Sequence, residues 1–158
     1  MKNKLRSKAA CLALVIAMAA APLVWSAPTY AVDTSDTPAD VDLTSVRAKI
    51  KAQDYAAALV ELKTIAEHSQ DADVYNLLGF TSRKTGDFKN SLSYYNKALE
   101  IKPDHKAAHE YLGELYIQTG DSAKAKEQLE VLTKLCPSGC EERDDLKKAL
   151  EGKSAGNW

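Results

Sequence analysis

The sequence predicts an all-α protein: a right-handed α-solenoid of about three helical hairpins, closed by a C-terminal capping helix. Three markers of one segment return 34 residues later, where Leu78-Gly79, Gly86-Asp87 and Pro103 become Leu112-Gly113, Gly120-Asp121 and Pro137. Between the markers, apolar residues recur at intervals of three and four, as they do on one face of a helix. No stretch alternates with a period of two for long enough to predict a strand. A repeat of this length with helical periodicity is typical of stacked hairpins.

The breaks between the periodic segments fix the expected helices. Each Gly-Asp pair offers a residue that tolerates positive φ, followed by an Asp that can cap the next helix. Each proline ends the second helix of a hairpin, since it lacks the amide hydrogen. We therefore expect helices near 42–52, 55–68, 72–85, 88–101, 105–119, 122–135 and 139–151.

The N-terminal segment has the pattern of an export signal. Four basic residues and no acidic residue occupy the first eight positions, and an apolar stretch rich in Ala and Leu follows. The apolar run is too short for a membrane-spanning helix, so we expect a signal peptide over 1–31, cleaved after Ala31, and an exported, periplasmic protein. A flexible linker would follow over 32–41. Cleavage would remove four of the 21 basic residues and none of the 22 acidic ones, leaving a net charge of −5 that argues against nucleic acid as a partner.

The best-formed unit, 72–105, resembles the tetratricopeptide repeat family, here as a small exported bacterial member. The residues that carry the resemblance are Tyr75, Leu78, Gly79, Gly86, Phe88, Tyr95, Ala98 and Pro103. The unit at 106–139 keeps most of this pattern, whereas the unit at 39–71 is degenerate, with Gln53 in place of the turn glycine. The segment 139–151 would cap the array, with Ser138 and Glu141 forming a capping box, and 152–158 would be a disordered tail.

The resemblance implies a function in protein interaction. In this family the first helix of each hairpin lines a concave groove, which here would expose Asp73, Asn76, Phe80, Arg83, Lys84, Glu110, Glu114, Ile117 and Gln118. We expect a non-enzymatic adaptor or scaffold that binds a protein or peptide there, with no cofactor and no small-molecule substrate. Membrane contact would occur only through the signal peptide before its cleavage.

Cys136 and Cys140 offer an alternative chemistry. They flank a three-residue turn, and their Cα atoms can reach the roughly 4.4 to 6.8 Å that a disulfide requires. An oxidising compartment favours a structural disulfide, while free thiols, a redox-active pair and a metal site remain open. His105 and His109, four residues apart on one helix, could complete a zinc site, although His109 occupies a packing position of the repeat. Nucleophile and phosphate-loop motifs are not found in the sequence, so the adaptor is the preferred interpretation and a thiol-redox or metal-binding protein is the alternative.

Overall fold

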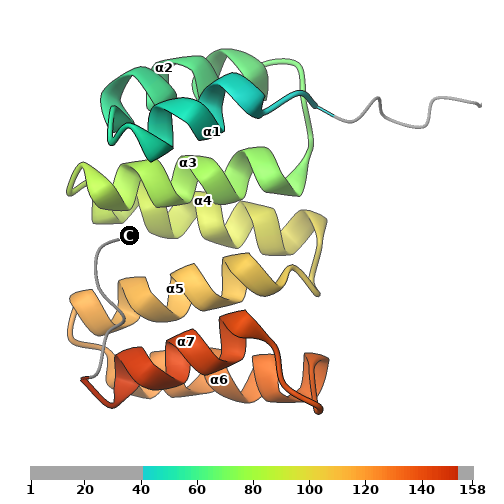
Figure 1. Ribbon diagram of the computed structural model, residues 1–158, viewed down its shortest axis with the longest axis vertical. Helices are drawn as coiled ribbons and strands as arrows, with labels where there is room; N and C mark the ends of the chain where they lie inside the picture. The colour runs from blue at the N-terminus through green and yellow to red at the C-terminus, as the bar shows by residue number, and fades with distance from the viewer. Residues whose placement is uncertain (1–40, 153–158) are drawn as a thin grey trace, which may run out of the picture. The chain divides into compact units, whose positions relative to one another are not determined.

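The computed structural model describes residues 41–152, which contain seven helices and no strand (Figure 1). The helices are α1 (Thr44–Lys51), α2 (Tyr55–Ala66), α3 (Ala72–Lys84), α4 (Phe88–Ile101), α5 (Lys106–Gln118), α6 (Ser122–Leu135) and α7 (Glu141–Leu150). The predicted all-α fold is thereby confirmed. The predicted signal peptide and nearly all of the predicted linker and tail lie outside the described residues. No helix within 41–152 has the length and hydropathy needed to cross a bilayer.

The helices form two layers of a stacked array. Figure 1 shows α1, α3, α5 and α7 following one another down one side, with α2, α4 and α6 behind them. Each hairpin packs its two helices together, and successive hairpins join through α2 against α3 and α4 against α5. The last hairpin is covered by α7, which packs against both α5 and α6. The capping role predicted for the C-terminal helix is therefore the role it has.

The turns inside the second and third hairpins have the predicted geometry. Gly86 and Gly120 adopt φ values of 83° and 85°, which a residue with a side chain rarely adopts. Asp87 then accepts a hydrogen bond from the Asn90 amide at 3.1 Å, and Asp121 accepts one from the Lys124 amide at 3.2 Å. Glycine followed by aspartate thus ends one helix and caps the next.

The degenerate first hairpin makes the same kind of turn without the glycine. Gln53 is the one residue other than glycine with positive φ, at 60°, within the part of the chain that the structure describes. Asp54 still caps the next helix, accepting from the Ala57 amide at 3.1 Å. A left-handed conformation costs a residue with a Cβ atom roughly 1 kcal/mol. The surrounding hairpin therefore imposes this turn on a sequence that disfavours it.

Close approach inside the second hairpin depends on Gly79. A Cβ atom at this position would lie 2.5 Å from the ring of Tyr95, which is fully buried. Ser91 of α4 is also fully buried, and its hydroxyl donates to the Gly79 carbonyl at 2.8 Å. Serine therefore keeps the contact and adds a buried hydrogen bond to it.

The start of α7 differs from the prediction. The helix begins at Glu141 with Cys140 as its N-cap residue, and no side chain caps it, so the predicted Ser138–Glu141 capping box is wrong. The reason is local backbone geometry, since Gly139 has φ of 103° and Cys140 is fully extended, which delays the helix by two residues. Acidic side chains in the first turn still interact favourably with the helix dipole. Leu146 is fully buried and holds the helix against the core.

Candidate functional site

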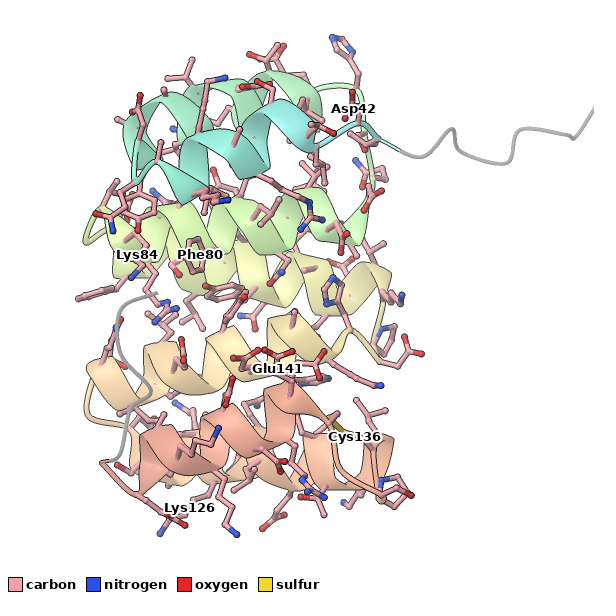
Figure 2. All side chains as sticks on the ribbon, in the orientation of Figure 1. Asp42, Phe80, Lys84, Lys126, Cys136 and Glu141 are labelled. Carbon is pink, nitrogen blue, oxygen red and sulfur yellow. A yellow bond between two sulfur atoms is a disulfide. The ribbon has the colours of Figure 1, made fainter. Side chains whose placement is uncertain are left out.

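The predicted groove residues lie on α3 and α5, in the layer formed by α1, α3, α5 and α7. We call the surface of this layer the odd-helix face. Figure 2 shows Phe80 and Lys84 on α3 and Glu141 at the start of α7, all on the side of the array that this layer forms. Side chains from neighbouring odd-numbered helices meet there, since α3 also contacts α5 and α5 contacts α7.

Most of the predicted groove residues are not exposed. Five of the nine retain only 4–6% of their accessible surface: Asn76, Phe80, Arg83, Glu110 and Glu114. Asp73, Lys84 and Ile117 are half-buried, and Gln118 is exposed. The expectation of an open, solvated groove is therefore wrong for these five positions. The cause is contact across the helices, because long side chains of α3 reach those of α5 and exclude water between them.

A row of aromatic rings runs across the face. The ring centroids of Tyr55 and Phe80 are 6.1 Å apart, those of Phe80 and Tyr111 are 5.3 Å apart, and those of Tyr111 and Tyr95 are 6.4 Å apart. These are the separations at which offset and edge-on ring pairs attract each other. The row links α2, α3, α4 and α5 and gives the face a rigid apolar floor.

Two cations lie on this aromatic floor. The Arg83 guanidinium is 5.7 Å from the Phe80 centroid and 5.9 Å from that of Tyr111. The Lys84 ammonium is 5.8 Å from the Tyr55 centroid and 5.7 Å from that of Phe80. Partial burial lowers the pKa of Lys84, and the neighbouring Arg83 charge lowers it further. Cation–π attraction keeps both charges in place at this partly dry surface.

A cavity of about 260 Å³ opens beside the aromatic row, between α1, α3 and α5. Its walls are Arg47, Ile50, Lys51, Leu77, Phe80 and Tyr111. The floor is apolar and the α1 side carries two basic residues. A space of this size fits one large side chain of a partner rather than a whole small-molecule ligand.

Arg83 and Glu114 form a buried ion pair between α3 and α5. Their charged atoms are 2.6 Å apart, and the two side chains are 2% and 6% exposed. Burial raises the pKa of the Glu114 carboxyl, and the guanidinium opposes that rise. Removing one member of such a pair leaves the other charge buried without compensation. The pair therefore fixes the two helices to each other at the centre of the face.

Glu110 lies one helical turn before Glu114 and has no such partner. Its carboxyl makes no hydrogen bond or ion pair with any other residue of 41–152, although only 4% of the residue is exposed. Burial raises its pKa to about 8, and the charge of Glu114 adds to this rise. Asp145 and Glu142 of α7 act in the same direction, whereas Arg83 opposes them. This end of the face is an acidic site without a cation of its own.

Asp73, by contrast, has a structural role. It accepts from Arg47 at 3.2 Å and from His105 at 2.8 Å, and so connects α1, α3 and the start of α5. The other ring nitrogen of His105 accepts from the Ala108 amide at 3.2 Å, which assigns the proton to the nitrogen facing Asp73. Asp73 is therefore already engaged within the fold.

The two histidines and two cysteines do not come together. His109 contacts Gln128 at 2.8 Å and the Pro103 carbonyl at 2.9 Å, which is the packing position expected for it. Within residues 41–152, no three side chains of His, Cys, Asp or Glu gather where they could hold a metal ion. Cys136 and Cys140 instead lie next to each other at the turn between α6 and α7, with their Cα atoms 5.9 Å apart.

The contribution of α1 to this face was not predicted from the sequence. Tyr55 in the first unit occupies the position that Phe88 has in the second, so these two units are offset by 33 residues rather than 34. The same offset applied to Phe80, Arg83 and Lys84 gives Arg47, Ile50 and Lys51, which are the three α1 residues that line the cavity. The signal was therefore present in the repeat, although Leu-Gly is missing from the degenerate unit.

Comparison with known proteins agrees with this architecture. A family model described as tetratricopeptide repeat matches residues 83–139, from the end of α3 to the turn before α7. A curated relative, the Sol locus transcriptional repressor of Clostridium acetobutylicum, is 43% identical over 54 residues, which are 34% of this chain and 17% of the repressor. The chain spans less than a fifth of the length of the curated relatives it matches.

Two solved structures share the fold over most of their length. The type III secretion translocator chaperone SycD of Yersinia enterocolitica aligns with a TM-score of 0.62 and 16% identity, covering 68% of this chain and 84% of that one. PcrH, in a complex with the chaperone binding region of PopD, aligns with a TM-score of 0.62 and 15% identity, covering 69% and 85%. At these identities the likeness shows the fold alone.

Proposed function

Because this chain is a tetratricopeptide repeat protein, we propose that it is a non-enzymatic adaptor or scaffold whose odd-helix face binds a segment of a partner protein. The observation that carries the proposal is the cavity between α1, α3 and α5, with its aromatic floor and its basic rim at Arg47 and Lys51. An apolar recess with few polar groups around it suits an anchoring side chain of a peptide, with the charges setting its direction. The PcrH complex with a region of PopD supports a partner of this class.

We further propose that the protein works in the periplasm after cleavage behind Ala31. The basic and then apolar N-terminal segment supports this localisation. The acidic charge expected after cleavage supports a protein partner rather than nucleic acid. No catalytic step, cofactor or small-molecule substrate is part of the proposal, and membrane contact is restricted to the signal peptide. N-terminal sequencing of the protein from a periplasmic extract should begin at Val32; an uncleaved cytoplasmic chain would contradict this part.

In that compartment we propose that Cys136 and Cys140 form a permanent structural disulfide. Their Cα separation of 5.9 Å and their place between α6 and the cap support the proposal. Alkylation under denaturing conditions should label neither cysteine until a reductant is added. Labelling of both before reduction, or zinc in the purified protein, would favour the thiol or metal alternative instead.

The adaptor proposal is tested by crosslinking in the living envelope. A photoreactive amino acid at position 50 replaces Ile50 in the cavity wall, and the same group at position 60 replaces Val60, which is 69% exposed on α2 in the other layer. We expect a discrete crosslinked partner from position 50 and none from position 60. The K51E substitution, on the exposed rim, should reduce the position-50 product.

Identical products from both positions, or a position-50 product unaffected by K51E, would show that the odd-helix face does not bind the partner. Mass spectrometry of the crosslinked band identifies the partner. Circular dichroism of K51E provides the control for folding.

A further inference from the structure

Glu110 is a buried carboxyl that the fold itself leaves without a counter-charge. The cation whose charge acts on Glu110 is Arg83, and that charge is engaged by Glu114 at 2.6 Å. On the α7 side, Asp145 pairs with Lys148 at 2.7 Å, so this lysine is engaged as well. A buried, unpaired carboxyl is costly to retain unless something else compensates for it. A compensating cation from outside residues 41–152 would resolve this cost.

The charges on the odd-helix face are also separated along the array. The α1 and α3 end carries Lys51 in the wall of the apolar cavity and Lys84 over the ring of Phe80, while Arg47 in the cavity wall pairs with Asp73. The α5 and α7 end carries Glu110 with Glu142 and Asp145 near it. An extended segment lying across the helices would therefore meet an apolar recess with a basic rim first and an acidic, water-poor site second. This arrangement fixes both the composition and the direction of what can bind.

The two sites are adjacent. Tyr111 lines the cavity, and Glu110 is the preceding residue of the same helix. Their Cβ atoms diverge by about 100° around α5, so the cavity and the carboxyl lie on the order of 10 Å apart. An extended peptide covers this distance in about two to four residues.

We propose that the partner segment carries an apolar or aromatic side chain that fills the cavity and, within about four residues of it, a lysine or arginine that pairs with Glu110. This inference rests on the proposed function and names the chemistry of its ligand. The pair would be a charge-assisted hydrogen bond at a residue that is only 4% exposed, where such a bond is stronger than one at the open surface. Loss of the basic side chain should weaken binding by about tenfold or more.

Binding should also depend on pH through the carboxyl that receives the cation. The charged groups facing Glu110 are Glu114 of its own helix, Glu142 and Asp145 of α7, and Arg83 of α3. With a pKa near 8, Glu110 is mostly protonated at pH 6.5, so pairing with a ligand cation releases a proton. Affinity for a lysine-containing peptide should therefore rise between pH 6.5 and pH 9.

The experiment selects a random dodecapeptide phage library on the purified full chain and on its E110Q variant, with E130Q as a matched control on the exposed surface of α6. We expect the wild type and E130Q to select peptides that combine an aromatic or large aliphatic residue with Lys or Arg two to four positions away. E110Q should lose the basic residue from the consensus. Fluorescence anisotropy then compares one selected peptide with its lysine-to-norleucine form on the wild-type protein at both pH values, which requires no variant to fold.

Equal affinity for the lysine and norleucine peptides, or a basic preference that survives in E110Q, would overturn the inference. If these peptides still lose binding in K51E, the adaptor proposal stands while the assignment of Glu110 falls. If no peptide is enriched, or none depends on Lys51, both are overturned.

Discussion

Helices α3 and α5 occupy corresponding places in two successive hairpins, yet their surfaces differ in charge and polarity. An offset of 34 residues places Asn76, Phe80 and Arg83 of α3 on Glu110, Glu114 and Ile117 of α5. Asn76 and Phe80 are as deeply buried as Glu110 and Glu114. The backbone is thus repeated, but the side chains at equivalent positions differ. On α3 they are an amide, an aromatic ring and a cation, and on α5 they are two acids and an aliphatic chain.

This difference shows which positions the repeat constrains. Helix positions that another helix approaches closely must be small: Gly79 lies against Tyr95 of its own hairpin, and Gly113 lies against Leu146 of the capping helix. Positions on the odd-helix face can carry a charged side chain where a neighbour of opposite charge compensates it, as Arg83 does for Glu114. Within residues 41–152, Glu110 has no neighbour that neutralises its charge, and this is the main difference between the surfaces of the two helices.

The largest expected effect comes from breaking the ion pair between the two helices. R83M leaves Glu114 buried without its cation, and we expect the free energy of unfolding at pH 8 to fall by about 3 to 5 kcal/mol. The loss should be smaller at pH 5 than at pH 8, because burial raises the pKa of Glu114 and a falling pH favours its neutral form. Urea denaturation at the two pH values measures both quantities.

The double variant R83M/E114M provides the control, because replacing both members with apolar side chains should restore most of the stability. If the double variant is as unstable as R83M, Arg83 stabilises the fold mainly through its packing on Phe80 and Tyr111. The contact between α3 and α5 would then depend on the shape of the Arg83 side chain rather than on its charge.

A second effect follows from the pKa of Glu110. The folded value of about 8 lies above the ordinary value of 4.5, so the native state binds the extra proton and stability falls as pH rises between these values. Relative to E110Q, the wild type should lose on the order of 4 kcal/mol between pH 4.5 and pH 9. Thermal or urea unfolding across this range measures the difference. A constant gap between wild type and E110Q would show that Glu110 is solvated, whereas E130Q should follow the wild type throughout.

The smallest effect compares the two helix glycines. In G79A the new methyl group would lie 2.5 Å from the ring of Tyr95, which is fully buried and has no room to move. In G113A it would meet both terminal methyl groups of Leu146, at 2.6 and 2.7 Å; this side chain is as buried as Tyr95, but rotation about its bonds moves these methyl groups more easily than a rigid ring can move. We expect G79A to lower the free energy of unfolding by about 2 kcal/mol and G113A by about 1 kcal/mol or less, after the gain in helix propensity. Equal losses would show that both contacts relax in the same way.

Much of the fold could be predicted because its determinants are local. Gly86 and Gly120 mark turns that need positive φ, and Asp87 and Asp121 can cap only the helices that follow them. The start of α7 could not be predicted in the same way, since Ser138 and Glu141 have the spacing of a capping box. The conformations of Gly139 and Cys140 instead place the helix start at Glu141.

The candidate site was predicted only in part. The repeat placed the residues of α3 and α5 on one face, but it could not show that Arg83 would reach Glu114 or that Asp73 would be occupied by Arg47 and His105. These are contacts between side chains more than 25 residues apart in the chain. No local pattern specifies such contacts.

The sequence by itself determined the period, the turns and the class of fold, because helix periodicity, positive φ and capping depend on residues a few positions apart. Tertiary structure alone decided which charges of the odd-helix face are paired and which side chains are buried. The physical reason is that burial and compensation depend on the distance between helices, and this distance is set by the packing of side chains such as Tyr95 and Leu146 against glycine. The 34-residue interval therefore predicts where the binding face lies, and the packing of its helices leaves Glu110 unpaired on it.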